Sequence, residues 1–158
     1  MHIEQFLTNQ GVRFEVIKHR PTFTAQSTAR VLYVVASEVA KSVLLRADDD
    51  YVLALIPGMA TVDLAAIKRL LQSDNVALVS EFELPRIVPD CQLGSVPAFG
   101  SEYGMKTIVD ESLAKEADIV IEGNTHAEAI RMRYADYVKL ERPLVARIAA
   151  HLEAQHSD

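Results

Sequence analysis

The chain has no tryptophan, a single cysteine, and no apolar run near the roughly 18 to 20 residues that a membrane-spanning helix needs. Because Cys91 has no second cysteine with which to form an internal disulfide, we expect a reducing compartment. The first residues carry neither a basic segment nor an apolar core, so no secretory signal is predicted. These absences together predict a cytoplasmic protein without a membrane partner.

The common signatures of metal, nucleotide and hydrolase sites are also missing. The five histidines and the single cysteine show no zinc-ligand spacing. No glycine-rich dinucleotide motif, P-loop or nucleophile elbow is present. We therefore expect no metal and no cofactor. Cys91 is either a nucleophile or a small core or loop residue, and because it lies beside Asp90 without a visible activating partner the second interpretation is favoured.

Negative charge is in excess, with a formal net charge of −6 at pH 7. Non-specific nucleic-acid binding depends on attraction to phosphates, so DNA is not an expected partner. A local pocket for one nucleic-acid end remains compatible with this balance. The 158 residues, 49% of them apolar, predict one compact domain over residues 1–158.

Apolar periodicity predicts helices and strands without a regular β-α-β repeat, and hence an α+β domain. The helical pattern occurs in segments 2–10, 25–33 and 61–72, and again from Pro143, where Leu144, Ile148 and Leu152 share one face. Thr24 is the expected N-cap of the second of these helices, and Thr61 or Asp63 opens the third. The strand pattern occurs in segments 12–19, 41–47, 51–57, 76–81, 106–110, 118–123 and 128–134. The acidic residues 48–50 predict a hairpin between the second and third of these strands.

Lys41 stands at the start of a predicted strand, on the same face as Val43, Leu45 and Ala47. Its ammonium group either enters a cleft, where it binds a phosphate or carbonyl oxygen, or reaches water while its stem packs. The pattern alone favours the second interpretation. His19, which precedes Pro21, similarly either lines a pocket or supports a turn.

Residues 93–104, LGSVPAFGSEYG, hold three of the six glycines of the chain. Glycine permits positive φ and close backbone approach, while proline fixes φ, so the segment is either a bent connection or a ligand cradle. Asp110 ends a buried-looking strand and is most simply an N-cap. Gly123 and Asn124 predict a tight turn that carries Thr125 and His126.

In their order and spacing, these segments resemble the YbaK/prolyl-tRNA synthetase-associated domain family of aminoacyl-tRNA editing domains. The resemblance runs through VAKSVLLRADDDYVLALIPG, TVDLAAIKRLL, GSVPAFG, TIVDESL, EGNTHAEAIRM and ADYVKL. It implies a mixed, mostly antiparallel sheet of about seven strands, flanked by helices. It also implies metal-free, trans-acting hydrolysis of the ester of a mischarged tRNA, such as alanyl- or cysteinyl-tRNA(Pro).

The resemblance implies that Lys41 anchors the 3′ CCA end, with Arg46 as a further contact, and that Lys41 and Gly100 serve catalysis. An aminoacyl ester is already activated, so a positioned water and backbone donors to its carbonyl suffice without a strong nucleophile. The implied substrate-binding set is His19, Thr24, Lys41, Gly94, Ser95, Val96, Pro97, Ala98, Phe99, Gly100, Asp110, Gly123, Asn124 and His126.

Two positions differ from the usual family pattern. Ala98 stands where a second proline is frequent, and Asn124 stands where glycine is frequent. These differences motivate an alternative hypothesis, a non-catalytic module that binds tRNA, a nucleotide or a synthetase. The acidic surface prompts a third, the hydrolysis of a small aminoacyl ester. The expected partners are an aminoacyl-tRNA and, as a further candidate, an aminoacyl-tRNA synthetase.

Overall fold

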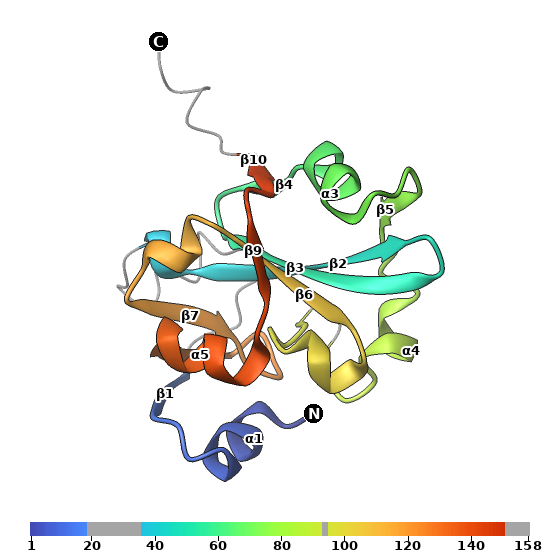
Figure 1. Cartoon of the computed structure of the whole chain (residues 1–158). Coiled ribbons are helices and arrows are strands. Elements are labelled where there is room, and N and C mark those ends of the chain that lie inside the picture. Colours follow the sequence, from blue (N-terminus) through green and yellow to red (C-terminus); the bar gives the residue numbers. More distant parts are fainter. Residues whose placement is uncertain (19–35, 93–94, 151–158) are drawn as a thin grey trace.

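A computed structural model describes residues 1–18, 36–92 and 95–150 of the chain (Figure 1). Its helices are α1 (Ile3–Asn9), α3 (Leu64–Leu71), α4 (Leu84–Ile87) and α5 (Tyr134–Glu141), with the 3₁₀ helices η1 (Ala36–Glu38), η2 (Gly100–Tyr103) and η3 (Leu113–Lys115). Its strands are β1 (Phe14–Lys18), β2 (Ala40–Ala47), β3 (Asp50–Pro57), β4 (Thr61–Val62), β5 (Val76–Leu78), β6 (Lys106–Asp110), β7 (Asp118–Glu122), β8 (Glu128–Arg133), β9 (Leu144–Ala146) and β10 (Ala149–Ala150). Within these residues, no helix is both long and apolar enough to span a membrane.

The strands form a larger and a smaller sheet. The larger has the order β5-β2-β3-β6-β9, with antiparallel pairs on both sides of β2 and parallel pairs on both sides of β6. The smaller is antiparallel, in the order β1-β8-β7, and a parallel bridge between Val39 and Val120 connects it to the start of β2. A short β10-β4 pair completes the pattern. The predicted α+β class with mixed, mostly antiparallel pairing is thus confirmed, although the strands are divided among sheets.

The β2–β3 hairpin forms the middle of the fold because both of its faces are covered. Strand alternation directs Leu45 into one apolar cluster with Ile67 of α3, which we call the α3 cluster. It directs Leu55 into a second cluster with Phe99 and Tyr137, which we call the loop cluster. Figure 1 shows α3 on one side of the hairpin and α5 and α1 on the other. Each large apolar side chain buried in this way contributes about 1.5–3 kcal/mol.

Helix α3 begins and ends as its sequence predicts. The carboxylate of Asp63 accepts the N–H of Ala66 at 3.1 Å and so caps the first turn. Gln72 ends the helix in the left-handed region, with φ of 54°. Of the two predicted caps Asp63 is therefore the right one, while Thr61 lies in β4.

The helix predicted to open at Pro143 is wrong. The chain leaves α5 through Arg142 at φ of 49°, and residues 144–146 form β9 beside β6. The backbone N–H groups of Ile148 and Ala149 are held by the side chain of Asp110, a long-range contact that periodicity does not reveal. Leu152, and the helix predicted over 25–33 with its cap Thr24, lie outside the described residues.

Candidate functional site

Two predicted site segments, the loop 95–100 and the turn 123–126, lie together in the structure. The hydroxyl of Ser95 donates to the carbonyl of Gly123 at 3.0 Å. The N–H of Val96 donates to Oε2 of Glu122, the last residue of β7, at 3.1 Å. The fold therefore ties the start of the loop to the end of β7.

Gln92, which precedes the loop in sequence, strengthens this junction. The N–H of Gln92 donates to the carbonyl of Asn124 at 3.0 Å, and the side-chain oxygen of Gln92 accepts the N–H of His126 at 2.7 Å. The turn is thus held by a backbone and a side-chain hydrogen bond from Gln92, which precedes His126 by 34 residues.

Glycine is required at two of the predicted positions by close packing. A Cβ atom on Gly123 would lie 2.8 Å from Cβ of Glu128, across the β7–β8 turn. A Cβ atom on Gly100 would lie 2.6 Å from Oγ1 of Thr107 and 3.2 Å from Cβ of Leu53. Neither glycine has a positive φ recorded, so lack of space, rather than backbone conformation, accounts for both residues.

Three of the backbone donors of the loop, those of Ser95, Val96 and Gly100, already have internal partners. The N–H of Ser95 donates to Gln92, and the N–H of Gly100 donates to Oγ1 of Thr107 at 3.2 Å. Pro97 has no N–H, and Ala98 is 0% exposed. In this conformation Gly100 shapes the loop without presenting its own N–H to a ligand, and its catalytic role stays a prediction.

Aromatic packing fixes the middle of the loop from behind. The ring of Phe99 lies 5.1 Å from that of Phe6 and 5.2 Å from that of Tyr137, in tilted arrangements. The hydroxyl of Tyr137 donates to the carbonyl of Ala98. Ala98 therefore belongs to the core of the loop cluster, where a small side chain fits.

A buried carboxylate that the sequence did not reveal supports the end of the loop. Glu141 of α5 is 7% exposed and accepts the N–H of Ser101 at 3.0 Å. It also accepts the hydroxyls of Ser101 and Thr107. Since Thr107 in turn binds the N–H of Gly100, this network fixes the position of the glycine.

Glu122 is the second carboxylate that sequence analysis missed. Burial raises the pKa of its side chain to about 8, against the opposing effect of the hydrogen bond from Val96. The only sequence signal is a carboxylate that ends the apolar run of residues 119–121. An acid whose pKa lies near neutrality, beside a predicted substrate loop, is a typical functional-site feature.

Lys41 lies near the start of β2, opposite Ile56 of β3, and is partly buried. Burial lowers the pKa of its ammonium group. Among the described residues, none forms a hydrogen bond or ion pair with this ammonium. Alternation places it on the face of the α3 cluster, whereas Ala98 and Phe99 pack on the opposite face of the sheet.

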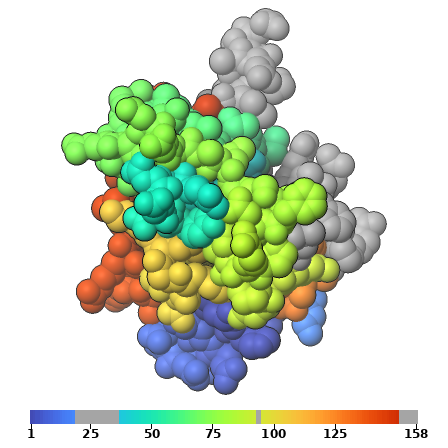
Figure 2. All heavy atoms as spheres, turned by 90° about the vertical axis from the view of Figure 1, so that its right-hand side faces the viewer, coloured from blue at the N-terminus to red at the C-terminus, as the bar shows by residue number. Residues whose placement is uncertain are grey.

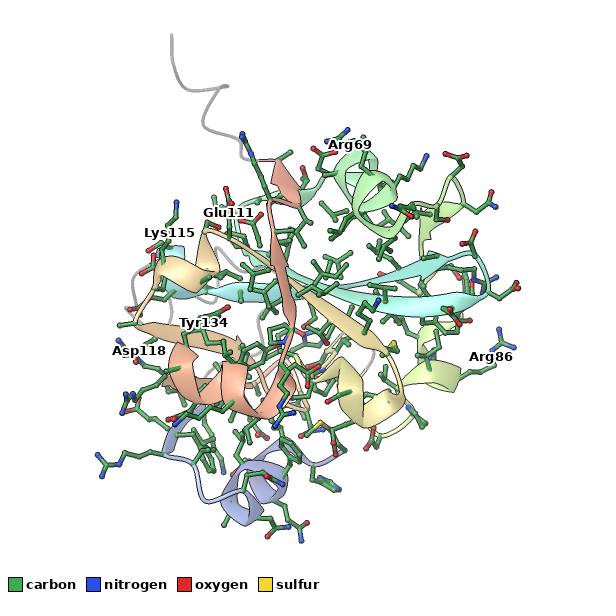
Figure 3. The ribbon with its side chains drawn as sticks, in the orientation of Figure 1. Arg69, Arg86, Glu111, Lys115, Asp118 and Tyr134 are labelled. Carbon is green, nitrogen blue, oxygen red and sulfur yellow. The ribbon has the colours of Figure 1, made fainter. Side chains whose placement is uncertain are left out.

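The Val39–Val120 bridge relates Lys41 to the loop–turn junction. The two strands run parallel there, and Lys41 and Glu122 each follow the bridge by two residues. The two strands therefore lie beside each other where β2 begins and β7 ends. Figure 3 shows Asp118, the first residue of β7, and Lys115 at the left of the view, and Arg86 pointing into solvent at the right.

Asp110 is 1% exposed and has a structural task as a clamp. Its carboxylate accepts the N–H groups of Ile148 and Ala149, both at 2.9 Å, and that of Ser112 at 3.1 Å. Burial alone would raise its pKa, but these hydrogen bonds hold the pKa below its ordinary value. It caps the turn into η3 and fixes the segment that follows β9.

The remaining predicted residues are distributed less closely. Asn124 directs its side chain to α1, where it accepts the N–H of Ile3 at 3.0 Å and donates to the carbonyl of Met1. Arg46 lies near the other end of the hairpin, ion-paired with Glu83. Its contact with the CCA end stays a prediction. His19, Thr24 and Gly94 lie outside the described residues.

A surface hollow of about 530 Å³ lies beside the β2–β3 turn, lined by residues 47–52 and 103–106, with Leu71 and Ser73. Figure 2 shows this face, with the teal turn above the yellow segment near residue 105. The hollow is at the far end of the hairpin from Lys41 and does not coincide with the predicted site. Within the described ranges, no three His, Cys, Asp or Glu residues gather as metal ligands would.

One family model matches most of the chain. The family model described as aminoacyl-tRNA editing domain matches residues 19–140. Proline–tRNA ligases of Lactobacillus gasseri and Lactobacillus johnsonii are 30% and 29% identical over 101 residues. That match covers 64% of this chain but only 18% of each ligase.

Solved structures share the fold. One described as a hypothetical protein has a TM-score of 0.86 at 19% identity, covering 95% of this chain and 100% of that one. Another, provisionally assigned as a trans-editing enzyme for prolyl-tRNA synthetase, has a TM-score of 0.84 at 20% identity, with 94% and 95% covered. At these identities the likeness shows the architecture alone.

Proposed function

The chain belongs to the aminoacyl-tRNA editing domain family, and on that premise we propose that it is a trans-acting deacylase that hydrolyses the ester of a mischarged tRNA. The observation that carries the proposal is the junction of loop 95–100 with the end of β7, next to the start of β2, the strand that carries Lys41. A family match over residues 19–140 includes all of these parts. In this proposal residues 1–158 act as one editing unit.

Lys41 is the proposed anchor for the 3′-terminal nucleotide. Its ammonium group is partly desolvated and has no hydrogen-bond or ion-pair partner in the described ranges, so its charge is available to a phosphate or carbonyl oxygen. A lysine that already carried an ion pair would lose that interaction on binding. A single-stranded CCA end needs only such a local basic contact, which the net charge of −6 permits.

The proposed reaction needs no side-chain nucleophile. Water attacks the ester carbonyl, the bond to the ribose oxygen breaks, and the free amino acid and tRNA leave. The free hydroxyl of the terminal ribose assists the water, and the loop with Gly94 and Gly100 shapes the acyl pocket. His19 and Thr24 complete the substrate-binding set in this proposal, and Asp110 holds the surrounding segments in place.

Alanyl- and cysteinyl-tRNA(Pro) are the first substrates to test. The curated relatives are proline–tRNA ligases, and one structural neighbour is provisionally assigned to trans-editing for prolyl-tRNA synthetase. An aminoacyl-tRNA, and a synthetase with which the chain associates, are accordingly the proposed partners. The predicted cytoplasmic location, where charged tRNA is made, belongs to the same proposal.

One observation favours a second candidate, a non-catalytic tRNA-binding module. The N–H groups of Ser95, Val96 and Gly100 donate to groups within the protein, which leaves fewer backbone donors to polarise an ester. Such a module would bind the aminoacyl end without turnover. Specific tRNA binding by the wild type, with ester lifetimes equal to those in buffer, would identify this function.

A deacylation screen tests the proposal. Alanyl-, cysteinyl- and seryl-tRNA(Pro) are incubated with the wild type, with Lys41→Ala, and with Lys106→Ala as a matched control at the exposed start of β6. We expect turnover of at least one ester by the wild type and the control, and a loss of about tenfold or more in Lys41→Ala, the size expected for one charge-assisted contact. Equal rates for wild type and Lys41→Ala would sink the assignment of Lys41.

A further inference from the structure

Glu122 is an acidic side chain without a cationic partner, placed where loop and turn meet. Its Oε2 accepts the N–H of Val96. Among the described residues, no other group forms a hydrogen bond or ion pair with the carboxylate, and Oε1 is left unengaged. A partly buried carboxylate without a counter-ion is costly to ionise, so its presence needs an explanation.

The charged groups nearby, among the described residues, do not bond to Glu122. Register pairs Glu122 with Ala129 of β8, so the face of the smaller sheet that carries Glu122 also carries Asp118 and Arg131. Arg131 binds Asp118 at 3.3 Å and Glu38 of η1 at 3.2 Å. Among the described residues, Lys41 of β2, His126 of the turn and Glu128 of β8 are further titratable groups on elements packed against this corner, and none of them bonds to Glu122. The loop 95–100 itself contains no charged residue.

The substrate class of the proposed function supplies the missing charge. Every aminoacyl ester carries an α-ammonium group one carbon away from the carbonyl at which hydrolysis occurs. A pocket that positions the carbonyl must also receive this cation, and a desolvated carboxylate is its natural partner. None of the other predicted site residues except Asp110 is acidic, and the carboxylate of Asp110 already accepts three backbone N–H groups.

We propose that the carboxylate of Glu122 is the counter-ion for the α-ammonium group of the aminoacyl ester. The inference rests on the deacylase function proposed above and adds the recognition of one part of its substrate. Oε2 stays on the N–H of Val96, while Oε1 faces the bound cation. The hydrogen bond between the loop and Glu122 thereby fixes the position of the ammonium relative to the acyl pocket.

The proposal can be tested by removing the positive charge from the α-nitrogen of the substrate. Alanyl-tRNA and N-acetylalanyl-tRNA differ in the charge of the α-nitrogen, and kcat/KM for both is measured with the wild type and with Glu122→Gln. Gln keeps an oxygen for the N–H of Val96, so the loop keeps its anchor. Glu128→Gln is the matched control. Glu128 lies on the adjacent strand β8, and alternation places it on the same face as Ile130 and Met132 of the loop cluster, opposite to the face that carries Glu122.

We expect the wild type and Glu128→Gln to prefer the free-amine ester. In Glu122→Gln this preference falls by about tenfold or more, while the rate on the N-acetyl ester stays unchanged, as loss of one charge-assisted contact requires. A Glu122→Gln protein that loses activity equally on both esters, or a wild type that does not distinguish them, overturns the proposal. A thermal melt of each variant shows that the comparison concerns folded protein.

Affinity measurements distinguish a failure of this inference from a failure of the proposed deacylase function. If the wild type hydrolyses neither ester, the deacylase proposal fails. Affinity for a non-hydrolysable 3′-alanylamino-adenosine and for its N-acetyl form then tests Glu122 directly. Tighter binding of the free amine by the wild type, lost in Glu122→Gln, supports the counter-ion; equal affinities of the wild type for both compounds overturn it.

Discussion

Replacing Glu122 with Gln removes a carboxyl group whose pKa burial raises from 4.5 to about 8. Between these two values the folded protein holds a proton on Glu122 that the unfolded chain has released. Stability from this group is therefore complete below the unfolded pKa and is lost as the pH rises through the folded pKa. The Gln variant has no such dependence, so the two proteins are expected to diverge as the pH rises.

The size of the effect follows from one proton. Each pH unit between the two pKa values costs the wild type about 1.4 kcal/mol relative to Glu122→Gln. From pH 5 to pH 7 the difference grows by about 2–3 kcal/mol, which corresponds to roughly 5–10 °C in melting temperature for a chain of this length. Above pH 8 the difference should reach a plateau, because both states of the wild type are then ionised.

Denaturant unfolding of both proteins at half-unit steps from pH 4 to pH 9 measures this divergence. The m value, the slope of the unfolding free energy with denaturant concentration, should be the same for both proteins, since the loop keeps its hydrogen bond to residue 122. Parallel stability curves between pH 5 and pH 8 would refute the buried, unpaired state of Glu122. That result would also remove the physical basis for Glu122 as a counter-ion.

Three further substitutions test the surrounding structure. Gly100→Ala is expected to destabilise the fold by about 1–3 kcal/mol in chemical denaturation, because the new methyl group overlaps Oγ1 of Thr107, and an unchanged midpoint would contradict this packing. Asp110→Asn should cost about 1–3 kcal/mol at neutral pH. Since the folded pKa of Asp110 is lowered, that cost should shrink as the pH falls below 3.8, and a cost independent of pH would argue against its hydrogen bonds. Asp63→Ala should lose about 1 kcal/mol from the N-cap of α3, measured by thermal melting, while Asp63→Asn should retain most of it.

Local pattern was sufficient where neighbours in sequence determine the structure. The β2–β3 hairpin was predictable because two alternating apolar runs flank the acidic residues 48–50. Helix α3 was predictable because Asp63 precedes an amphipathic run that buries Ile67. In both cases the contacts that determine the structure join residues that are close in sequence, within one hairpin or one helix.

Long-range contacts explain what local pattern could not supply. The segment after Pro143 forms an edge strand that pairs with β6. Asp110, which precedes Ile148 by 38 residues, accepts the backbone N–H of Ile148. The helical spacing of this segment was therefore misleading. The environment of Glu122 depends on Val96, 26 residues away, and no motif marks it. The junction of the loop with the turn 123–126 was anticipated only through the family resemblance, because spacing alone left each as an ordinary bend.

The central claim is that this chain hydrolyses aminoacyl-tRNA. The most direct test is the first-order loss of the ester of alanyl-tRNA(Pro), alongside correctly charged prolyl-tRNA(Pro), at increasing concentrations of the wild-type protein. We expect a rate of loss of the mischarged ester that rises in proportion to protein concentration and exceeds the spontaneous rate, while the prolyl ester is not hydrolysed. If the esters of alanyl-, cysteinyl- and seryl-tRNA(Pro) all decay at the spontaneous rate while the tRNA is bound, the chain is a binding module and the deacylase assignment is wrong.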